Sequence, residues 1–225
     1  MARKTIHFLH IGKCAGTQLK LICDQVNSLE PGVRIVYHNH WVRLVDLTGG
    51  DPYFFSIRDP FTRFVSGFYS RKRKGQPRKL VEWTAHEAQA FGIFEHANDL
   101  AESLFQSGEL GIKAFSAMKS ILHTAQNQSD WFTARGFFLY RRPPIWIVRQ
   151  ECFDTDLKVL LDRAGLAALE PSIKVSSDRV SAHMNDYSGI PDLSPKARKN
   201  LRIWYAQDFE VYRACSEWIK VNSTV

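Results

Sequence analysis

A lysine, an arginine and two histidines occupy positions in the first third of the chain where they could perform chemistry. Lys13 lies in a turn rich in small residues, Arg58 directly follows an apolar run, and His38 and His40 lie between them. Lysine and arginine bind anions, and imidazole titrates near neutral pH, as a general base requires. These residue types predict a site that holds an anionic ligand beside a proton acceptor.

The turn that carries Lys13 has the composition of an anion-binding loop. It reads His10-Ile11-Gly12-Lys13-Cys14-Ala15-Gly16-Thr17-Gln18, and a helix is expected to start within it. Small residues let an anion approach the backbone, and the N–H groups and dipole at a helix start attract negative charge. Because the lysine precedes the Gly-Thr pair, this is not a Walker A motif. A tight turn with a solvated lysine is an alternative of about equal weight.

Arg58 begins the second segment, which runs to Ser66. It leaves the carboxyl end of a predicted strand, the place where α/β sheets bind ligands. Asp59-Pro60 then predicts a helix start, and Arg58 and Ser66 could converge on one anion. The alternative is that Arg58 and Asp59 only pair and cap the helix. We favour anion binding for Arg58 and Ser66, and a structural ion pair for Arg63.

His38 and His40 are candidates for the general base. At positions i and i+2 they would project to the same side of an extended segment. Solvated surface histidines and a metal-binding pair are the alternatives. The letters His-Asn-His also resemble HNH nucleases, which need further ligands on a helix after a β-hairpin. Here a buried strand and Arg58 follow instead, so the nuclease is the weaker interpretation.

Strands and helices alternate along the segments that must position these residues. Apolar runs predict strands at 5–11, 34–37, 53–57 and 145–148, and apolar periodicity predicts helices at 17–28, 60–71 and 155–164. A single last helix is expected from Ser194-Pro195, with one stripe formed by Leu201, Tyr205, Phe209 and Tyr212. Residues 76–130 are helical in composition, and 173–189 are expected to form a long surface loop. The spacing predicts an α/β fold, a mainly parallel sheet flanked by helices with right-handed crossovers, in a single domain over residues 1–225.

Composition narrows the classes of partner. Thirty basic and 23 acidic residues give a net charge of +7, which favours a polyanionic ligand. The 44% apolar and 24% charged residues are typical of a globular protein and exclude disordered, collagen and disulfide-scaffold classes. The four cysteines are widely spaced and are expected to be small buried hydrophobes. Neither a membrane-spanning run nor a signal peptide is visible, so we expect a cytoplasmic protein unless a targeting segment was removed.

Three segments in this order resemble the 3′-phosphoadenosine 5′-phosphosulfate (PAPS)-dependent sulfotransferases, in particular the carbohydrate branch of heparan sulfate 2-O-sulfotransferase type. Gly12-Lys13-Cys14-Ala15-Gly16-Thr17 resembles the family's 5′-phosphosulfate loop, usually written Pro-Lys-Thr-Gly-Gly-Thr. Residues 58–66 resemble its 3′-phosphate motif, Arg-Asp-Pro-x-x-Arg-x-x-Ser, at every defined position. His38-Asn39-His40 resembles the His-Gly-His of the 2-O enzymes, and residues 204–212 resemble the family's closing helix.

The resemblance implies a P-loop-like sulfotransferase fold and a role for each matched residue. Lys13, with Cys14, Ala15, Gly16, Thr17 and Gln18, would hold the 5′-phosphosulfate, and Arg58 and Ser66 would hold the 3′-phosphate. His40, assisted by His38, would take the proton of an acceptor hydroxyl for in-line transfer, while Lys13 stabilises the leaving group. The donor co-substrate would be PAPS, the product 3′-phosphoadenosine 5′-phosphate (PAP), and no metal or nucleic acid would be needed.

Two further segments are expected to contribute contacts. Lys174 and Arg179 lie where relatives fold a basic loop over the nucleotide, although an exposed polar loop is equally weighted. The basic run 71–74, which contains Arg71, Arg73 and Lys74, would together with Arg78 and Lys79 suit an anionic acceptor, such as a sulfated or carboxylated saccharide, although charge runs more often form solvated faces. The alternatives to a sulfotransferase are a P-loop kinase and a basic, metal-dependent nuclease or nucleic-acid-binding protein.

Overall fold

Four parallel strands form the centre of the protein, in a computed structural model that describes residues 3–132, 136–178, 180 and 185–223. The strands are β1 (Lys4–Leu9), β2 (Val33–Tyr37), β3 (Tyr53–Ile57) and β4 (Ile147–Arg149). They pair in the order β2-β1-β3-β4, and each pair is parallel, with Phe8 opposite both Tyr37 and Phe54. The expected α/β fold with a parallel sheet is therefore confirmed.

Helices account for most of the remaining described residues. The α-helices are α1 (Gly16–Leu29), α2 (Pro60–Lys72), α3 (Ala85–Ile93), α4 (Ala97–Ser103), α5 (Glu109–Ser120), α6 (Leu122–Ala125), α7 (Phe138–Arg141), α8 (Phe153–Ala164), α9 (Pro195–Trp204) and α10 (Ala206–Asn222). Short 3₁₀ helices span Leu44–Asp46, Gln128–Trp131, Gln150–Cys152 and Ala167–Ser172. Residues 76–130, for which only a helical composition was predicted, thus contain four of the α-helices.

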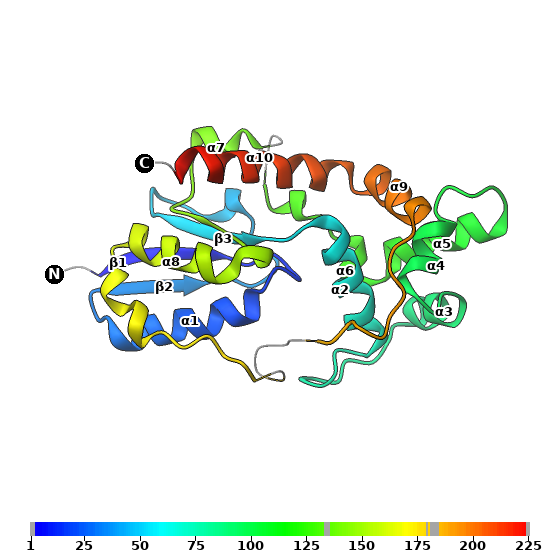
Figure 1. Cartoon of the computed structure of the whole chain (residues 1–225), viewed down its shortest axis with the longest axis horizontal. Coiled ribbons are helices and arrows are strands. Elements are labelled where there is room, and N and C mark those ends of the chain that lie inside the picture. The colour runs from blue at the N-terminus through cyan, green and yellow to red at the C-terminus, as the bar shows by residue number, and fades with distance from the viewer. Residues whose placement is uncertain (1–2, 133–135, 179, 181–184, 224–225) are drawn as a thin grey trace.

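The strands place alternate side chains on two covered faces, as buried parallel sheets do. Phe54 packs with the apolar faces of α1 and α8, represented by Leu19 and Leu160. Phe55 points the other way and contacts the rings of Phe132 and Phe138. In Figure 1 α1 and α8 lie on one side of the sheet and α10 on the other. This three-layer arrangement leaves the carboxyl ends of the strands as the open edge of the sheet.

A second hydrophobic cluster lies beside the sheet and fixes the direction of α2. It joins α2, through Phe64 and Phe68, to α3, α4, α5 and α9. Asp59 caps α2, since its carboxylate accepts hydrogen bonds from the N–H groups of Phe61 and Thr62 at 3.0 Å each, and Pro60 occupies the first turn. Figure 1 shows α2 between the sheet and this group of helices, so its amino end meets the sheet edge.

The prediction of one last helix is wrong, because the chain turns at Tyr205 between α9 and α10. The Tyr205 hydroxyl donates to the Thr124 carbonyl at 2.6 Å, and its backbone leaves the helical region with φ −101° and ψ 31°. Leu201 belongs to the cluster around α2, whereas Val211 belongs to the cluster around the sheet. The turn lets one continuous apolar pattern cover two different cores.

Candidate anion-binding and catalytic site

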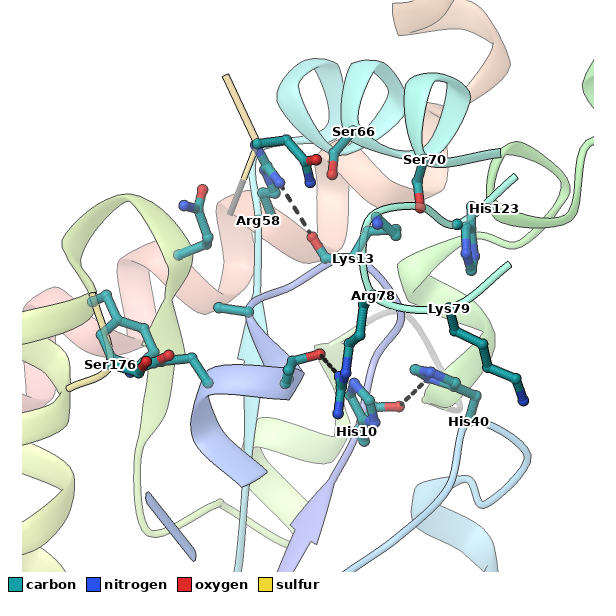
Figure 2. A pocket seen from close by; sticks show the side chains of 18 of the residues that line it. His10, Lys13, His40, Arg58, Ser66, Ser70, Arg78, Lys79, His123 and Ser176 are labelled. Atoms are coloured by element: carbon teal, nitrogen blue, oxygen red, sulfur yellow. Dashed lines mark hydrogen bonds between the residues drawn. The ribbon is translucent and has the colours of Figure 1, made fainter. Parts of the chain in front are cut away.

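A cavity of about 1030 Å³ opens where β1 and β3, the two central strands, end. The loop after β1 and Arg58 after β3 lie on its wall, with side chains of α2 facing them. Figure 2 shows Ser66 and Ser70 pointing from α2 into this space, with Lys13 below them. The carboxyl edge of a parallel sheet is where α/β proteins bind ligands, and this cavity lies there.

The loop after β1 has an unusual backbone. Lys13 and Ala15 both adopt left-handed φ angles, 68° and 60°, which side-chain-bearing residues rarely do. Ala15 precedes α1, no side chain caps that helix, and no acidic residue lies in its first turn. Alternating left- and right-handed residues turn backbone N–H groups into a concave anion site, and an uncapped helix start adds its dipole. The loop therefore has the geometry of an anion cradle.

Gln18 supports this interpretation independently. Its side chain is 7% exposed and lines the cavity, yet neither its amide nitrogen nor its amide oxygen has a hydrogen-bond partner among the described residues. A buried amide without partners is costly, so such a group in a cavity wall indicates a missing ligand or water. Thr17 and Gly16, beside it in the first turn of α1, also line the cavity.

Lys13 lies within a cluster of positive charges. Its pKa is lowered to about 8, first by burial and then by the neighbouring guanidinium groups of Arg58, Arg73 and Arg63. The lysine remains mainly protonated at pH 7, so the cations repel one another until an anion binds. The arrangement favours a ligand with more than one negative charge.

Cys14, in contrast, points away from the cavity. Its side chain is fully buried, and its thiol donates to the Gln128 side-chain oxygen at 3.2 Å. Burial raises the pKa of the thiol to about 12, so it stays a thiol at neutral pH. The predicted contact of Cys14 with the donor can involve only its backbone. The expectation of buried cysteines is confirmed for Cys14, Cys23 and Cys215, whereas Cys152 is partly exposed.

Arg58 does not pair with the adjacent Asp59 in the described structure. Its Nε donates to the Thr62 hydroxyl at 3.0 Å, and its Nη1 lies 3.5 Å from the Lys13 carbonyl. Figure 2 shows this last contact as the link that brings Arg58 to the loop after β1. Ser66, 5% exposed, lines the same cavity and accepts a long hydrogen bond, 3.5 Å, from the Tyr187 hydroxyl. Arg58 and Ser66 thus lie on one wall, as the anion-binding interpretation requires.

Arg63 has the structural role that its position in the sequence suggested. It is 2% exposed, its Nε donates to the Gly12 carbonyl at 3.0 Å, and its Nη1 donates to the Gln126 carbonyl at 2.8 Å. Its Nη1 also lies 3.8 Å from the carboxylate of Asp208. Arg63 therefore ties α2 to the anion-binding loop, and the predicted ion pair is confirmed.

Gln128, which the sequence did not single out, joins the loops after β1 and β3. Its side-chain oxygen accepts from the Arg58 N–H at 2.9 Å, and its amide nitrogen donates to the Arg58 carbonyl at 2.8 Å. The same oxygen accepts the Cys14 thiol, and the Gln128 N–H donates to the buried carboxylate of Asp208 at 2.9 Å. One side chain thereby holds the loop after β1 and the loop after β3 in register.

His40 lies in the cavity wall and is suited to act as a base. Its Nδ1 donates to the His10 carbonyl at 3.3 Å, an arrangement that leaves Nε2 unprotonated. Its pKa is lowered from the usual value: burial is the main cause, Lys13 and Arg63 add to it, and the hydrogen bond to His10 opposes it. His40 is therefore a neutral imidazole at pH 7.

His38 lies elsewhere, so the expectation that the two histidines project to the same side is wrong. Its Nε2 is 2.8 Å from Nδ1 of His7, and it is not among the residues that line the cavity. The strand ends at Tyr37, and the Asn39 side chain accepts from the Trp41 N–H at 2.9 Å in a turn. This turn breaks the alternation on which the prediction rested.

The basic residues predicted to bind an acceptor have other partners. Arg71 lies in the cavity wall, but its Nε and Nη2 donate to the two carboxylate oxygens of Glu87 at 2.6 and 2.7 Å. Arg73 lies over the Tyr187 ring, 5.9 Å from its centroid, and Lys74 forms a 2.6 Å ion pair with Glu82. The guanidinium of Arg71 is thus already paired with a carboxylate distant in sequence, and its contact with an acceptor stays a prediction.

Lys174 is exposed and is not among the residues that line the cavity. Its backbone N–H donates to the Gln25 side-chain oxygen at 2.8 Å, and its carbonyl accepts from the Gln25 amide nitrogen at 2.9 Å. The neighbouring residues Val175, Ser176 and Ser177 line the cavity instead. Arg179, the other predicted contact in this loop, lies outside the described residues.

Three side chains of the cavity were given no role from the sequence. They are His10, Tyr37 and His123. Of these, only His10 carried a local signal, since it follows the carboxyl end of a predicted strand. The pKa of His123 is well below the usual value, because the ring is buried and faces Lys13 and Arg63.

Arg78 and Lys79, which belong to the basic run that the sequence assigned to an anionic acceptor, also line the cavity. Arg78 reaches the first turn of α1, where its Nη1 donates to the Thr17 hydroxyl at 3.2 Å. Ser70, on the polar face of α2, lines the cavity as well.

Comparisons with known proteins do not add to these observations. No protein-family model matches the sequence, and no significant match is found among curated proteins. Within the described ranges, no three His, Cys, Asp or Glu side chains gather in a way that could hold a metal ion. None of the helices in the described part of the chain combines the length and apolar character needed to cross a bilayer.

Proposed function

We propose that this protein is a sulfotransferase that transfers the sulfuryl group of PAPS to a hydroxyl group of a saccharide, and that its fold is the P-loop-like fold of such enzymes. The observation that carries the proposal is one cavity that is lined by two groups of residues suited to anions. Lys13 and the start of α1 would form one anion site, and Arg58 with Ser66 would form the other, while His40 lines the same cavity. Two anion sites fit a nucleotide that carries phosphates at both its 5′ and 3′ positions.

The residues present fit this donor. The cradle formed by Lys13, the left-handed Ala15 and the uncapped start of α1 would hold the 5′-phosphosulfate. The unpartnered Gln18 amide offers a donor and an acceptor to the same ligand. Arg58 and Ser66 would hold the 3′-phosphate through charge-assisted hydrogen bonds. When bound, the donor supplies a sulfuryl group whose bond to the bridging phosphate oxygen breaks as the acceptor oxygen bonds to sulfur.

His40 and Lys13 supply the proton and charge balance of this transfer. The neutral Nε2 of His40 takes the proton from the acceptor hydroxyl, which increases the electron density on the attacking oxygen. The Lys13 ammonium stabilises the negative charge left on the phosphate oxygen of PAP. The remaining cations act through position, since transfers of this kind depend mainly on alignment and electrostatic stabilisation.

The cavity has room for an acceptor beside the nucleotide. Its volume of about 1030 Å³ lies just above the usual range for ligand sites, about 300–1,000 Å³. Arg78 and Lys79, from the basic run that the sequence assigned to the acceptor, line the part near His40 (Figure 2) and would contact an anionic saccharide. We place the reaction in the cytoplasm, with no nucleic acid as partner, as the sequence led us to expect.

A turnover screen tests the proposal. The protein is incubated with PAPS and a panel of hydroxylated acceptors, including neutral and anionic oligosaccharides, and both PAP release and the added sulfuryl mass are measured. We expect acceptor-dependent PAP release without added metal. Consumption of ATP with magnesium, or metal-dependent cleavage of DNA, with no sulfated product from any acceptor would overturn the proposal.

A further inference from the structure

His10 is a buried side chain of the cavity to which the proposed transfer assigns no task. It directly follows the last residue of β1, is 6% exposed and lines the cavity. Its Nδ1 is hydrogen-bonded to the Tyr37 hydroxyl, and its ring stacks against Phe8 with centroids 5.7 Å apart. The ring is thus held from two neighbouring strands and has little freedom to move.

His10 contacts the proposed base in two ways. The ring centroids of His10 and His40 are 3.9 Å apart, and the His10 carbonyl accepts the hydrogen bond from Nδ1 of His40. The ring contact fixes where the His40 imidazole lies, and the hydrogen bond fixes which nitrogen carries its proton. Figure 2 shows this hydrogen bond between the His40 ring and the backbone carbonyl of His10.

On its other side His10 touches the first residue of α1. A Cβ atom on Gly16 would lie 1.9 Å from Nε2 and 2.0 Å from Cδ2 of His10, far inside the contact limit. The φ of Gly16 is outside the left-handed region, so its backbone conformation does not demand glycine. Glycine is required at the start of the anion-binding helix because the His10 ring occupies the space of a side chain.

We infer that His10 is a positioning residue whose ring sets the distance between the base, His40, and the start of the anion-binding helix at Gly16. This inference rests on the proposed function for the role of His40, although the contacts themselves do not depend on it. A fixed spacing matters because the attacking hydroxyl, held at His40, must align with a sulfur atom held at the start of α1. A misplacement of about 1 Å can reduce such a rate by roughly 100-fold.

The electrostatics around His40 agree with this role. His40 faces His10 from the end of β1, Lys13 from the following loop, Arg63 from α2 and His123 from α6. Burial, with His40 as the second cause, lowers the pKa of His10 to about 3, so its ring is neutral and excludes water without adding charge. Removal of the ring would admit water to His40, and the pKa of His40 would rise towards its ordinary value.

Two substitutions test the ring of His10 separately from its side-chain hydrogen bond to the Tyr37 hydroxyl; both keep the backbone carbonyl that accepts from His40. His10→Ala removes the contact with both His40 and Gly16, whereas His10→Phe keeps a ring of similar size in the same place. We expect His10→Ala to lower kcat at least about 10-fold while thermal stabilisation by PAP is kept, and to raise the pH at which His40 titrates in an NMR titration. His10→Phe should leave the His40 titration close to that of the wild type.

A double-mutant cycle tests the contact with the helix. Gly16→Ala alone should lower the free energy of unfolding and weaken PAP binding, because the new methyl group strikes the His10 ring. In the His10→Ala background the same substitution should cost far less, since the ring is absent. An equal cost of Gly16→Ala in both backgrounds, or an unchanged His40 titration in His10→Ala, would overturn the inference.

These readouts distinguish the inference from the proposed function. The His40 titration and the cycle in unfolding free energy are measured without donor or acceptor, so they report on His10 even if no sulfuryl transfer occurs. If His10→Ala does not fold, Gly16→Ala and His10→Phe remain: wild-type stability of Gly16→Ala would then refute the contact.

Discussion

Replacement of Arg58 by alanine should weaken binding of the 3′-phosphorylated nucleotide selectively. In the structure the Nε of Arg58 is used by the Thr62 hydroxyl, and Nη1 has only the long contact to the Lys13 carbonyl. No protein acceptor is found for Nη2 in the part of the chain that the structure describes, so its two N–H groups are available to a phosphate. Arg58→Ala removes these donors and their positive charge together.

The expected loss follows from the number and kind of these hydrogen bonds. A hydrogen bond to a charged group contributes about 1.5–3 kcal/mol when buried. Because Arg58 is partly exposed and three neighbouring cations remain (Lys13, Arg63 and Arg73), we expect the pair of bonds to contribute about that much in total. The Kd for PAP should therefore rise about 10- to 150-fold, whereas that for AMP, which lacks the 3′-phosphate, should rise at most about threefold.

Calorimetric titration of both nucleotides into both proteins measures this difference. Arg34→Ala is a matched control, because it removes the same charge from an exposed position on β2 outside the cavity wall. We expect Arg34→Ala to bind PAP within about twofold of the wild type. Equal losses for PAP and AMP in Arg58→Ala, or equal losses in the two variants, would refute the assignment of Arg58 to the 3′-phosphate.

Three further predictions concern catalysis, pH and stability. His40→Ala should lower kcat by about 10²- to 10⁴-fold with the Kd of PAP unchanged in titration, and near-normal turnover would remove His40 from the base role. The value of kcat/KM should fall below pH 6.5 as His40 takes up a proton, because the pKa of His40 is lowered from its ordinary value. It should fall again above about pH 8 as Lys13 loses its proton. A profile of kcat/KM that stays flat from pH 5 to 9 would contradict this prediction. Arg71→Ala should lower the free energy of unfolding, measured with denaturant, by about 3–5 kcal/mol, because it leaves the buried Glu87 carboxylate unpaired, and a loss below about 1 kcal/mol would assign that pair a minor role.

The fold could be predicted where its signals are local. The apolar run of β3 and the Asp59-Pro60 start of α2 are contained in a few adjacent residues, and both were located correctly. The turn at Tyr205 could not be found in this way, because the apolar spacing continues across it while the residues on either side pack against different clusters. The apolar periodicity of a sequence indicates which residues are buried, but it does not indicate which other residues they pack against.

The residues of the site could likewise be predicted only where their signal lies in adjacent residues. Lys13, Arg58 and Ser66 occupy positions defined relative to a strand end or a helix start, and the structure brings them to one cavity. His38 was misplaced because the alternation rule holds only for extended backbone, and the chain turns at Asn39. The pairing of Arg71 with Glu87 could not be predicted, because the two residues are 16 positions apart and meet only when the chain folds Glu87 of α3 against the carboxyl end of α2.

The proposed function requires that two anion sites in one cavity hold opposite ends of a single nucleotide. Calorimetric titration of the unmodified protein with PAP, AMP and adenosine 3′-monophosphate measures this requirement. We expect one PAP to bind per chain, with a Kd at least about 10-fold lower than that of either monophosphate. Equal affinity for PAP and AMP would refute the proposed function, because it would mean that no group in the cavity engages the 3′-phosphate.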